Sequence, residues 1–540
     1  MRSVVLVAVL LTLSVVGKSQ KKNSNNTVEG RPKLVVGIVI DQMRWDYLYR
    51  YAARYSDNGF KRILNEGFSC ENTFIPYTPT VTAAGHTCIY TGSVPAIHGI
   101  MGNNWYRRDL KRSWYCTEDT SAKTVGSNSN AGDMSPSGIW TTTVTDELRM
   151  ATNFRSKVVG IALKDRGAIL PAGHSANGAY WFDNANGAFI TSSYYMKDLP
   201  EWVKQFNNRK LPDQYLQQNW NTLYPIDTYI ESTADNKSYE GNLEDNTFPH
   251  ITANIKNDKY NALRTTPYGN TLTFEMAKAA IEGERLGQTA STDFLAVSFS
   301  SPDYIGHTFG PNSVEAEDNY LRLDNELASF FNYLDRKIGN GQYTIFITAD
   351  HAVAHVPEEL KENKIPAGVL SEGGLQAVLN EMIEKRFKIK SAVASVMNYQ
   401  VYLNRAVIAE DEQKVTNAVI ERLLEYPAIV NAFALKELNT TTLPANIKNM
   451  VSNGYNQKLS GDIQFIFKPQ YFSGGATGTT HGSWNPYDSH IPLLWYGWGI
   501  KKGKTHRETY MTDISATLSA LLNIQMPSGC IGHVIEEVMQ

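Results

Sequence analysis

The sequence has no excess of basic residues: 51 Lys and Arg stand against 54 Asp and Glu, which gives a formal net charge of −3 over 540 residues. Proteins that bind nucleic acid or anionic membrane surfaces need a surplus of clustered Lys and Arg. We therefore expect neither kind of partner. Internal repeats are absent too, and the length suits about three domains or one large α/β domain with insertions.

Long apolar runs are also scarce. The one candidate is at the N-terminus, in MRSVVLVAVLLTLSVVGKSQ, where Arg2 precedes an apolar stretch at residues 4–16. This stretch is shorter than the ~20 residues of a spanning helix, and it has no Cys that could carry a lipid anchor. Gly17 and Ser19 supply small residues for cleavage, so residues 1–19 are predicted to be a secretory signal peptide. We expect an exported, soluble protein with no stable membrane insertion.

Cysteine is rare, and none of its spacings is typical of a zinc knuckle. An even number in an exported protein permits two disulfides, and four cysteines allow three pairings. The sequence does not choose among the pairings, and we interpret the residues as structural. They are Cys70, Cys88, Cys116 and Cys530.

The rest of the chain alternates between apolar and amphipathic segments. Residues 33–41, KLVVGIVID, form a continuous apolar run that is typical of a buried parallel strand. Strands alternating with helices favour an α/β fold, with a mostly parallel central sheet and helices on both faces. Further strands are expected at residues 157–163, 293–301, 343–350 and 491–499, and helices at residues 271–287, 314–339 and 512–524.

The predicted catalytic domain spans residues 33–540, after an Asn-rich segment at residues 20–32 that we expect to be disordered. Two segments interrupt the alternation. Residues 171–268 are rich in Asn, Tyr, Trp and Pro, and residues 361–470 mix short strands with helices. We interpret both as insertions that decorate the core and help to shape a pocket.

Acidic residues and histidines gather where the predicted strands end. Functional groups collect at the carboxyl ends of parallel strands. An isolated Asp there is more often a helix cap, and an isolated His is more often packed, but capping hardly explains six such residues at four separate loops. Mixed His and Asp ligands suit Zn²⁺ well. The six are Asp41, Asp303, His307, Asp350, His351 and His481, and they divide into two groups of three.

Several motifs, in order from about residue 33 to residue 524, resemble the alkaline phosphatase superfamily. They are VIDQMRWDYL, the segment around Thr82, GNNW (102–105), LKDRGA (163–168), SPDYIGHTFGP, TADH and THGSWNPYDSHIPL. Within the superfamily they look most like the bacterial, periplasmic, phosphate-irrepressible alkaline phosphatases that use threonine. The resemblance implies a periplasmic zinc enzyme with two ions per chain that hydrolyses small-molecule phosphate monoesters. We expect a monomer.

The resemblance also implies residue roles. Asp41, Asp350, His351 and the Thr82 oxygen would bind one zinc, and Asp303, His307 and His481 the other. The transferred phosphoryl group would contact Asn103, Lys164 and Arg166. The sequence departs from the family in DHAVAH, where Ala352 replaces a common Gly. His355 and His490 lie near predicted ligands in sequence, and we interpret them as supporting or structural residues.

Thr82 is one of five threonines in residues 77–92, YTPTVTAAGHTCIYTG. The small residues after it can start a helix, whose N-terminus favours negative charge. A zinc ion on its oxygen would lower the hydroxyl pKa by several units and make it a nucleophile. The other four are expected to cap or to face helix neighbours. We predict a covalent phosphothreonine at Thr82, formed and broken in two in-line displacements.

The main alternative is a nucleotide pyrophosphatase/phosphodiesterase of the same superfamily, which shares the zinc sites, the threonine and the asparagine but lacks the Lys–x–Arg pair. A sulfatase needs a Cys or Ser followed by Pro and Arg, which residues 82–85 do not supply. A three-metal phosphatase would use serine. A catalytically inactive binding protein would not need the intact ligand set.

Overall fold

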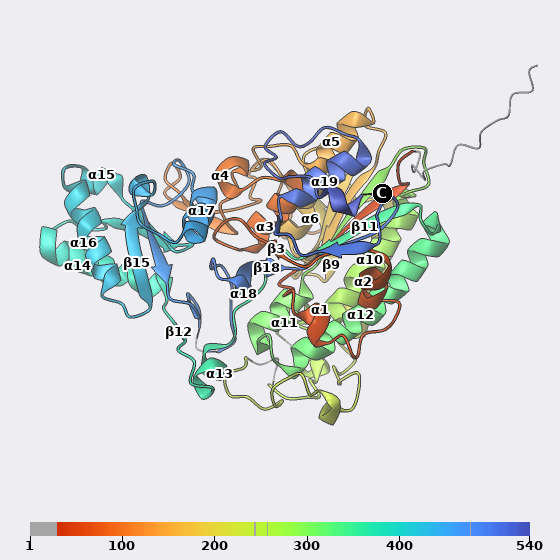
Figure 1. The fold of residues 1–540 in the computed structure, drawn as a ribbon, viewed down its shortest axis with the longest axis horizontal. Helices are drawn as coiled ribbons and strands as arrows, with labels where there is room; N and C mark the ends of the chain where they lie inside the picture. Colours follow the sequence, from red (N-terminus) through yellow and green to blue (C-terminus); the bar gives the residue numbers. More distant parts are fainter. Residues whose placement is uncertain (1–29, 242, 244, 256, 476, 540) are drawn as a thin grey trace, which may run out of the picture.

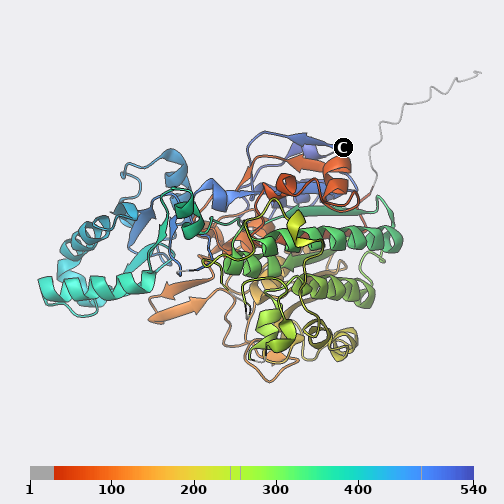
Figure 2. The same cartoon turned by 90° about the horizontal axis from the view of Figure 1, so that it is seen from below.

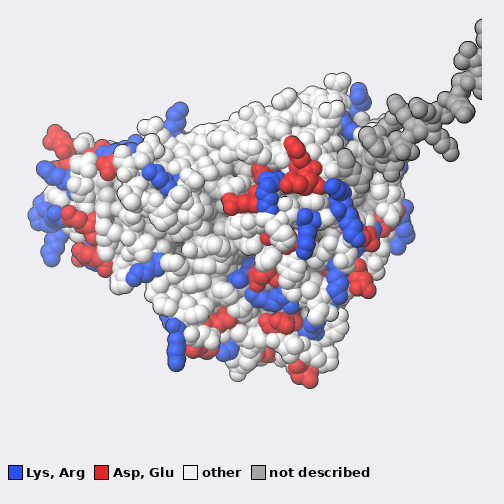
Figure 3. Space-filling view, in the orientation of Figure 1, with Lys and Arg blue, Asp and Glu red and all other residues white. Residues whose placement is uncertain are grey.

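The computed structural model describes residues 30–241, 243, 245–255, 257–475 and 477–539. The predicted signal peptide and most of the predicted lead-in lie outside these residues. The chain forms an α/β fold with helices on both faces of a central sheet, as predicted (Figure 1). In the described part, no helix has the length and apolar character to cross a membrane. On the face in Figure 3, acidic and basic side chains are interspersed, as the balanced composition suggests.

The central sheet is mixed, with the predicted parallel pairing in its middle and antiparallel pairs toward both sides. Its middle strands pair in parallel, and β19, β9 and β6 pair antiparallel. The order is β20-β2-β19-β11-β1-β10-β7-β8-β9-β6. The bounds are β1 (Leu34–Ile40), β2 (Phe68–Cys70), β6 (Thr124–Val125), β7 (Val158–Ala162), β8 (Gly178–Asp183), β9 (Ala188–Ser192), β10 (Asp293–Phe299), β11 (Tyr343–Thr348), β19 (Leu493–Gly497) and β20 (Gly503–Thr505).

The register of the middle strands places their carboxyl ends together. Ile40 at the end of β1 pairs with Phe299 at the end of β10, and Val39 pairs with Thr348 at the end of β11. All residues of these three strands are buried, which is why each reads as an apolar run. The residues that follow the three strands therefore meet at one edge of the sheet.

Helices cover both faces of this sheet (Figure 1). One face carries α3 (Thr82–Thr91), α5 (Val144–Ala151), α6 (Asp165–Ala172) and α19 (Asp513–Leu522), and the other carries α2 (Phe60–Glu66), α10 (Tyr268–Glu284) and α12 (Val314–Leu334). The predicted helices at residues 271–287, 314–339 and 512–524 correspond to α10, α12 and α19, with ends that differ by a few residues.

Residues 361–470, which we call the lobe, project to one side of the core (Figures 1 and 2). The lobe has its own four-stranded sheet, in the order β13-β14-β16-β15, and its own hydrophobic cluster. Its main elements are β13 (Val393–Met397), β14 (Gln400–Leu403), β15 (Ile429–Ala434), β16 (Ile463–Phe467), α14 (Glu372–Phe387), α16 (Glu412–Leu424) and α17 (Ala445–Gly454).

The other expected insertion, residues 171–268, is partly core. Strands β8 and β9 extend the central sheet, and β8 is buried along its whole length. Tyr180, Trp181 and Phe182 supply the apolar content of β8. The aromatic residues that suggested a surface insertion therefore lie in part in a buried strand of the central sheet. The division of the chain into domains stays a prediction.

The four cysteines form no disulfide. Three of them are buried and Cys530 is partly exposed, so they pack as small apolar side chains.

Candidate functional site

Six acidic and histidine side chains meet at the carboxyl edge of the central sheet, in two groups of three. Within each group, the potential ligand atoms all lie within 4.8 Å of one another. One group is Asp41, Asp350 and His351, and the other is Asp303, His307 and His481. These are the two sets of three that the sequence predicts. Their use as metal ligands stays a prediction.

The first group follows two neighbouring strands. Asp41 comes directly after β1, and its backbone N–H donates to the carbonyl of Phe299 at the end of β10 (3.1 Å). Asp350 and His351 follow β11 and are fully buried. The His351 Nε2 atom lies 3.4 Å from Asp41 Oδ1 and 3.6 Å from Asp350 Oδ2. No hydrogen bond reaches Asp41 Oδ1 or Asp350 Oδ2 from the described residues, although both are buried.

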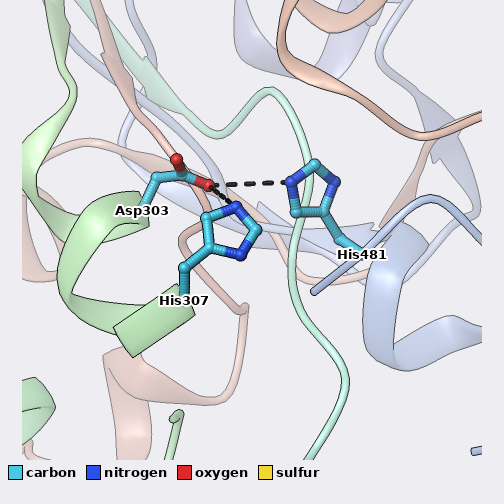
Figure 4. Close-up of side chains that lie close together, drawn as sticks. All are labelled: Asp303, His307 and His481. Carbon is cyan, nitrogen blue, oxygen red and sulfur yellow. Dashed lines mark ion pairs between the residues drawn. The ribbon is translucent and has the colours of Figure 1, made fainter. Parts of the chain in front are cut away.

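The second group uses a helix and a distant loop. Asp303 and His307 lie one turn apart on α11 (Ser301–Phe309), where a loop was expected, and His481 comes from the Gly- and Thr-rich segment near the C-terminus. Figure 4 shows the three side chains pointing toward one another. The Nε2 atoms of His307 and His481 lie 3.1 and 3.6 Å from Asp303 Oδ1.

All three histidines are oriented in the same way. The Nδ1 atom of His307 lies 2.8 Å from the carbonyl of Thr479, that of His351 3.0 Å from the carbonyl of Ala352, and that of His481 2.7 Å from the carbonyl of Thr80. A carbonyl can only accept, so each Nδ1 carries the proton and each Nε2 is left with a free lone pair toward the carboxylates. Metal-binding histidines show this arrangement.

The three carboxylates are buried among charged neighbours, and their pKa values shift strongly in opposite directions, upward for Asp41 and downward for Asp303 and Asp350. Burial, followed by the charges of Asp303 and Asp350, raises the pKa of Asp41 well above its ordinary value. Burial, followed by the neighbouring histidine rings, lowers the pKa of His481 well below its ordinary value, so this imidazole is neutral near pH 7. Carboxylate oxygens facing imidazole nitrogens are a donor set that suits Zn²⁺.

Thr82 begins α3, as predicted, and Val81 before it is extended. The Thr82 hydroxyl lies 3.4 Å from His351 Nε2, whereas four neighbouring threonine hydroxyls donate to backbone carbonyls. These four bonds are Thr78 to Gly482 (3.1 Å), Thr80 to Ser483 (3.0 Å), Thr87 to Ala83 (2.7 Å) and Thr91 to Thr87 (2.7 Å). Of the five threonines, Thr82 is the one whose hydroxyl faces the acidic and histidine groups.

Lys164 lies between the two groups. Its ammonium donates to Asp41 Oδ2 (2.6 Å) and to Asp303 Oδ2 (2.5 Å), and the residue is 3% exposed. Arg166, at the start of α6, is partly buried and touches neither group through an ion pair in the described structure. Both residues line a cavity of about 250 Å³, together with Tyr115, Arg264 and Tyr304.

Asn103 also lies beside Thr82. Its side-chain oxygen accepts a hydrogen bond from the backbone N–H of Ala83 (2.9 Å), which leaves the amide NH₂ as a donor near the first turn of α3. Asn103 is therefore next to Thr82, while Arg166 is connected to the site through the cavity that it lines with Lys164.

Two residues that the sequence reasoning missed support the site. The Nδ1 atom of His86, one turn after Thr82, lies 3.3 Å from Asp350 Oδ2. The side chain of Gln42 donates to Asp303 Oδ1 (2.7 Å), and its backbone is left-handed, with φ 69°. Because His86 lies four residues after Thr82 in a predicted helix, the sequence could have placed its side chain on the same helix face as Thr82.

His355 and His490 lie outside both groups. The Nε2 atom of His355 is 3.2 Å from the Arg44 guanidinium. The ring of His490 stacks on Trp45, with centroids 4.7 Å apart. Ala352 is accommodated: its methyl group is buried, and its N–H donates to the carbonyl of Asp488 (2.9 Å).

The comparisons with known proteins agree with this arrangement. The model of the type I phosphodiesterase / nucleotide pyrophosphatase family matches residues 35–490. Alkaline phosphatase PhoV of Synechococcus elongatus is 55% identical over 94% of this chain and 93% of its own length. A protein of Myroides odoratus named calcium-transporting ATPase is 51% identical over 94% of this chain and 95% of its own length.

Alkaline phosphatase PafA of Elizabethkingia meningoseptica is 50% identical over 99% of this chain and 98% of its own length. A crystal structure of PafA matches with a TM-score of 0.92 and covers 95% of this chain and 99% of that one. The predicted superfamily and the α/β fold are thereby confirmed.

Proposed function

Because this chain belongs to the type I phosphodiesterase / nucleotide pyrophosphatase family, within the alkaline phosphatase superfamily, we propose that it is a zinc-dependent alkaline phosphatase that hydrolyses phosphate monoesters. The observation that carries the proposal is the position of the Thr82 hydroxyl beside two groups of potential zinc ligands, with Lys164 between the groups. The names of PhoV and PafA support the same activity.

The two groups of side chains fit zinc. Asp41, Asp350 and His351 would hold one ion, and the group shown in Figure 4 would hold the other. Bound zinc would supply Lewis acidity for the attacking and leaving oxygens.

The residues of the chain would then have different roles in the two displacements. The Thr82 oxygen attacks phosphorus, the bond from phosphorus to the ester oxygen breaks, and a phosphothreonine forms. A water molecule next attacks the phosphothreonine, which releases inorganic phosphate and restores the hydroxyl. Asn103, Lys164 and Arg166 would bind the transferred group, whose charge spreads over its equatorial oxygens in the transition state.

The second candidate is a phosphodiesterase, because the matching family model carries that name. The cation pair favours the monoester: a monoester has one more charged oxygen than a diester, and Lys164 and Arg166 offer two positive charges to meet it. The names alkaline phosphatase and calcium-transporting ATPase both describe the release of phosphate, so ATP is a useful third substrate.

The test is steady-state kinetics on a matched aryl monoester and diester and on ATP, with metal analysis of the same sample. We expect kcat/KM to be highest for the monoester, and acid-quenched enzyme to carry phosphate on Thr82. A diester preference would support the phosphodiesterase, and full activity after complete chelation would exclude the zinc mechanism.

We also propose that the protein is exported, with the signal peptide at residues 1–19, and that it acts in the periplasm as a monomer. The support is the charged and apolar pattern of these residues, which lie outside the described structure. N-terminal sequencing of the mature protein from a periplasmic extract, with light scattering for its mass, tests both statements.

A further inference from the structure

A chain of hydrogen bonds ends on the Arg166 guanidinium. Its Nη1 atom donates to the Tyr115 hydroxyl (3.0 Å), and that hydroxyl donates to Asp165 Oδ1 (2.7 Å). The hydroxyl of Thr117 donates to the other carboxylate oxygen, Asp165 Oδ2 (2.5 Å). These bonds run from the guanidinium through the phenol to the carboxylate, so the three groups have a defined relative orientation.

The phenol lies between the carboxylate and the guanidinium, although Asp165 and Arg166 are adjacent in sequence. The described structure records no ion pair between Arg166 and any carboxylate, and the Arg166 Nε atom has no hydrogen-bond partner there. A direct Asp165–Arg166 ion pair would neutralise the charge that a phosphoryl oxygen needs. A neutral phenol orients the guanidinium without cancelling its charge.

The phenol can fill this place because it stays protonated. Burial has the largest effect on the pKa of Tyr115 and raises it. The charge of Arg166 lowers this pKa and the carboxylate of Asp165 raises it, so the pKa ends well above its ordinary value. Tyr115 therefore accepts from Arg166 and donates to Asp165 at the same time.

Tyr115 also lies on the hairpin that directly follows Asn103. It is the last residue of β5 (Arg112–Tyr115), which pairs antiparallel with β4 (Asn104–Arg107), and Cys116 N–H donates to the Asn103 carbonyl (3.0 Å). One strand of the hairpin therefore begins next to Asn103, a predicted phosphoryl contact, and the other ends at Tyr115, which bonds to Arg166.

We infer that Tyr115, held by Asp165 and Thr117, is a positioning residue that aims the Arg166 guanidinium at the transferred phosphoryl group and thereby sets the preference for monoesters. This inference rests on the proposed function of Arg166. It predicts that the phenolic hydroxyl acts through Arg166 and not through the stability of the hairpin.

The experiment is a cycle of Tyr115→Phe, Arg166→Ala and the double variant, with kcat/KM measured on the aryl monoester and diester. Tyr115→Phe removes one hydroxyl, so we expect about a 3- to 10-fold loss for the monoester, in line with one hydrogen bond, and no change for the diester. In the Arg166→Ala background it should cause no further loss.

Tyr343→Phe is the matched control. Tyr343 is also a buried tyrosine bonded to an aspartate, with its hydroxyl 2.7 Å from Asp335 Oδ1, but it lies at the start of β11, at the opposite edge of the sheet from the site. It should leave both rates unchanged. Thermal unfolding of all variants shows whether each is folded.

Four outcomes overturn the inference. Equal loss on both substrates in Tyr115→Phe would mean a structural role, and a further monoester loss in the Arg166→Ala background would mean that the phenol acts by another route. If Arg166→Ala itself left the monoester-to-diester ratio unchanged, the proposed role of Arg166 would fail along with the inference. A changed ratio in Arg166→Ala with no effect of Tyr115→Phe would remove the positioning role alone.

Discussion

Replacing Lys164 and Arg166 by alanine, singly and together, should remove the preference for phosphate monoesters. The transferred group carries its charge on equatorial oxygens in the transition state, and one of these oxygens is charged in a monoester but substituted in a diester. A cation facing that oxygen therefore helps the monoester alone. The diester rate should change much less.

The contacts set the size of the effect. A charge-assisted hydrogen bond contributes about 1.5–3 kcal/mol, so each variant should lose roughly 10- to 150-fold in monoester kcat/KM. The double variant should lose roughly two to four decades if the two contacts are additive. Diester hydrolysis measured under the same conditions gives the reference.

The two residues should differ in their effect on metal content. Lys164 donates to Asp41 and Asp303, one carboxylate from each group, whereas Arg166 touches neither group. Removing the Lys164 ammonium removes a positive charge that competes with a cation, so Lys164→Ala should bind zinc at least as tightly as the parent. Metal analysis of each kinetic sample separates loss of metal from loss of a phosphoryl contact.

Lys157→Ala is the control, because this ammonium pairs with Glu284 (3.3 Å) at the other end of β7 and should affect neither rate. If the monoester and diester rates of the Lys164 and Arg166 variants fell by the same factor, with zinc retained, the cation pair would act in uniform binding or in structure. The reasoning from charge would then be refuted.

Three further predictions follow from the site and its surroundings. The purified protein should contain about two zinc ions per chain, and metal analysis should show a site lost in His481→Ala but both kept in His355→Ala, since His355 contacts Arg44 instead of the carboxylates. Thr82→Ala should lose covalent phosphorylation in acid-quenched samples, while Thr82→Ser, which keeps the oxygen, should retain appreciable activity; phosphate on another residue would contradict the choice of nucleophile. Burial, followed by the charge of Glu315, raises the pKa of Glu240 from 4.5 to about 9. The free energy of unfolding should therefore be highest below pH 4.5, where this carboxyl is protonated in both the folded and the unfolded state, and should fall as the pH rises toward 9. Glu240→Gln should therefore unfold at a higher temperature than the parent at pH 8 and at a similar one at pH 4.5, by calorimetry.

The sequence was sufficient to predict the α/β fold and the strands that position the site, for a physical reason. Strands such as β1 and β11 are buried on both faces, so they appear as apolar runs. Parallel pairing brings their ends together, and residues such as Asp41 and Asp350 that follow those runs must then be neighbours. The paired ends explain why residues far apart in sequence lie side by side, whereas their assignment to two zinc sites was implied by the family resemblance and stays a prediction.

What the sequence could not supply depends on tertiary contacts. The place of Lys164 between two carboxylates follows from the meeting of β1, β7 and α11, which no local pattern encodes. The role of Gln42 depends on a left-handed backbone that a glutamine rarely adopts, with φ 69°. The strand β8 was taken for part of an insertion because Asn-rich neighbours hid a short buried segment.

The lobe is linked to the phosphoryl-binding side of the site through the hairpin β4–β5. The side chain of Asn398 in the lobe donates to the carbonyl of Asn104 (2.8 Å), and the Arg108 guanidinium at the hairpin turn reaches Asp462 (2.9 Å). Because Asn103 precedes β4 and Tyr115 ends β5, these contacts brace the element that supports two of the predicted phosphoryl contacts. The insertion at residues 361–470 therefore does more than decorate the core, since it contacts the hairpin that follows Asn103 and ends at Tyr115, two residues for which we propose roles in binding the transferred group.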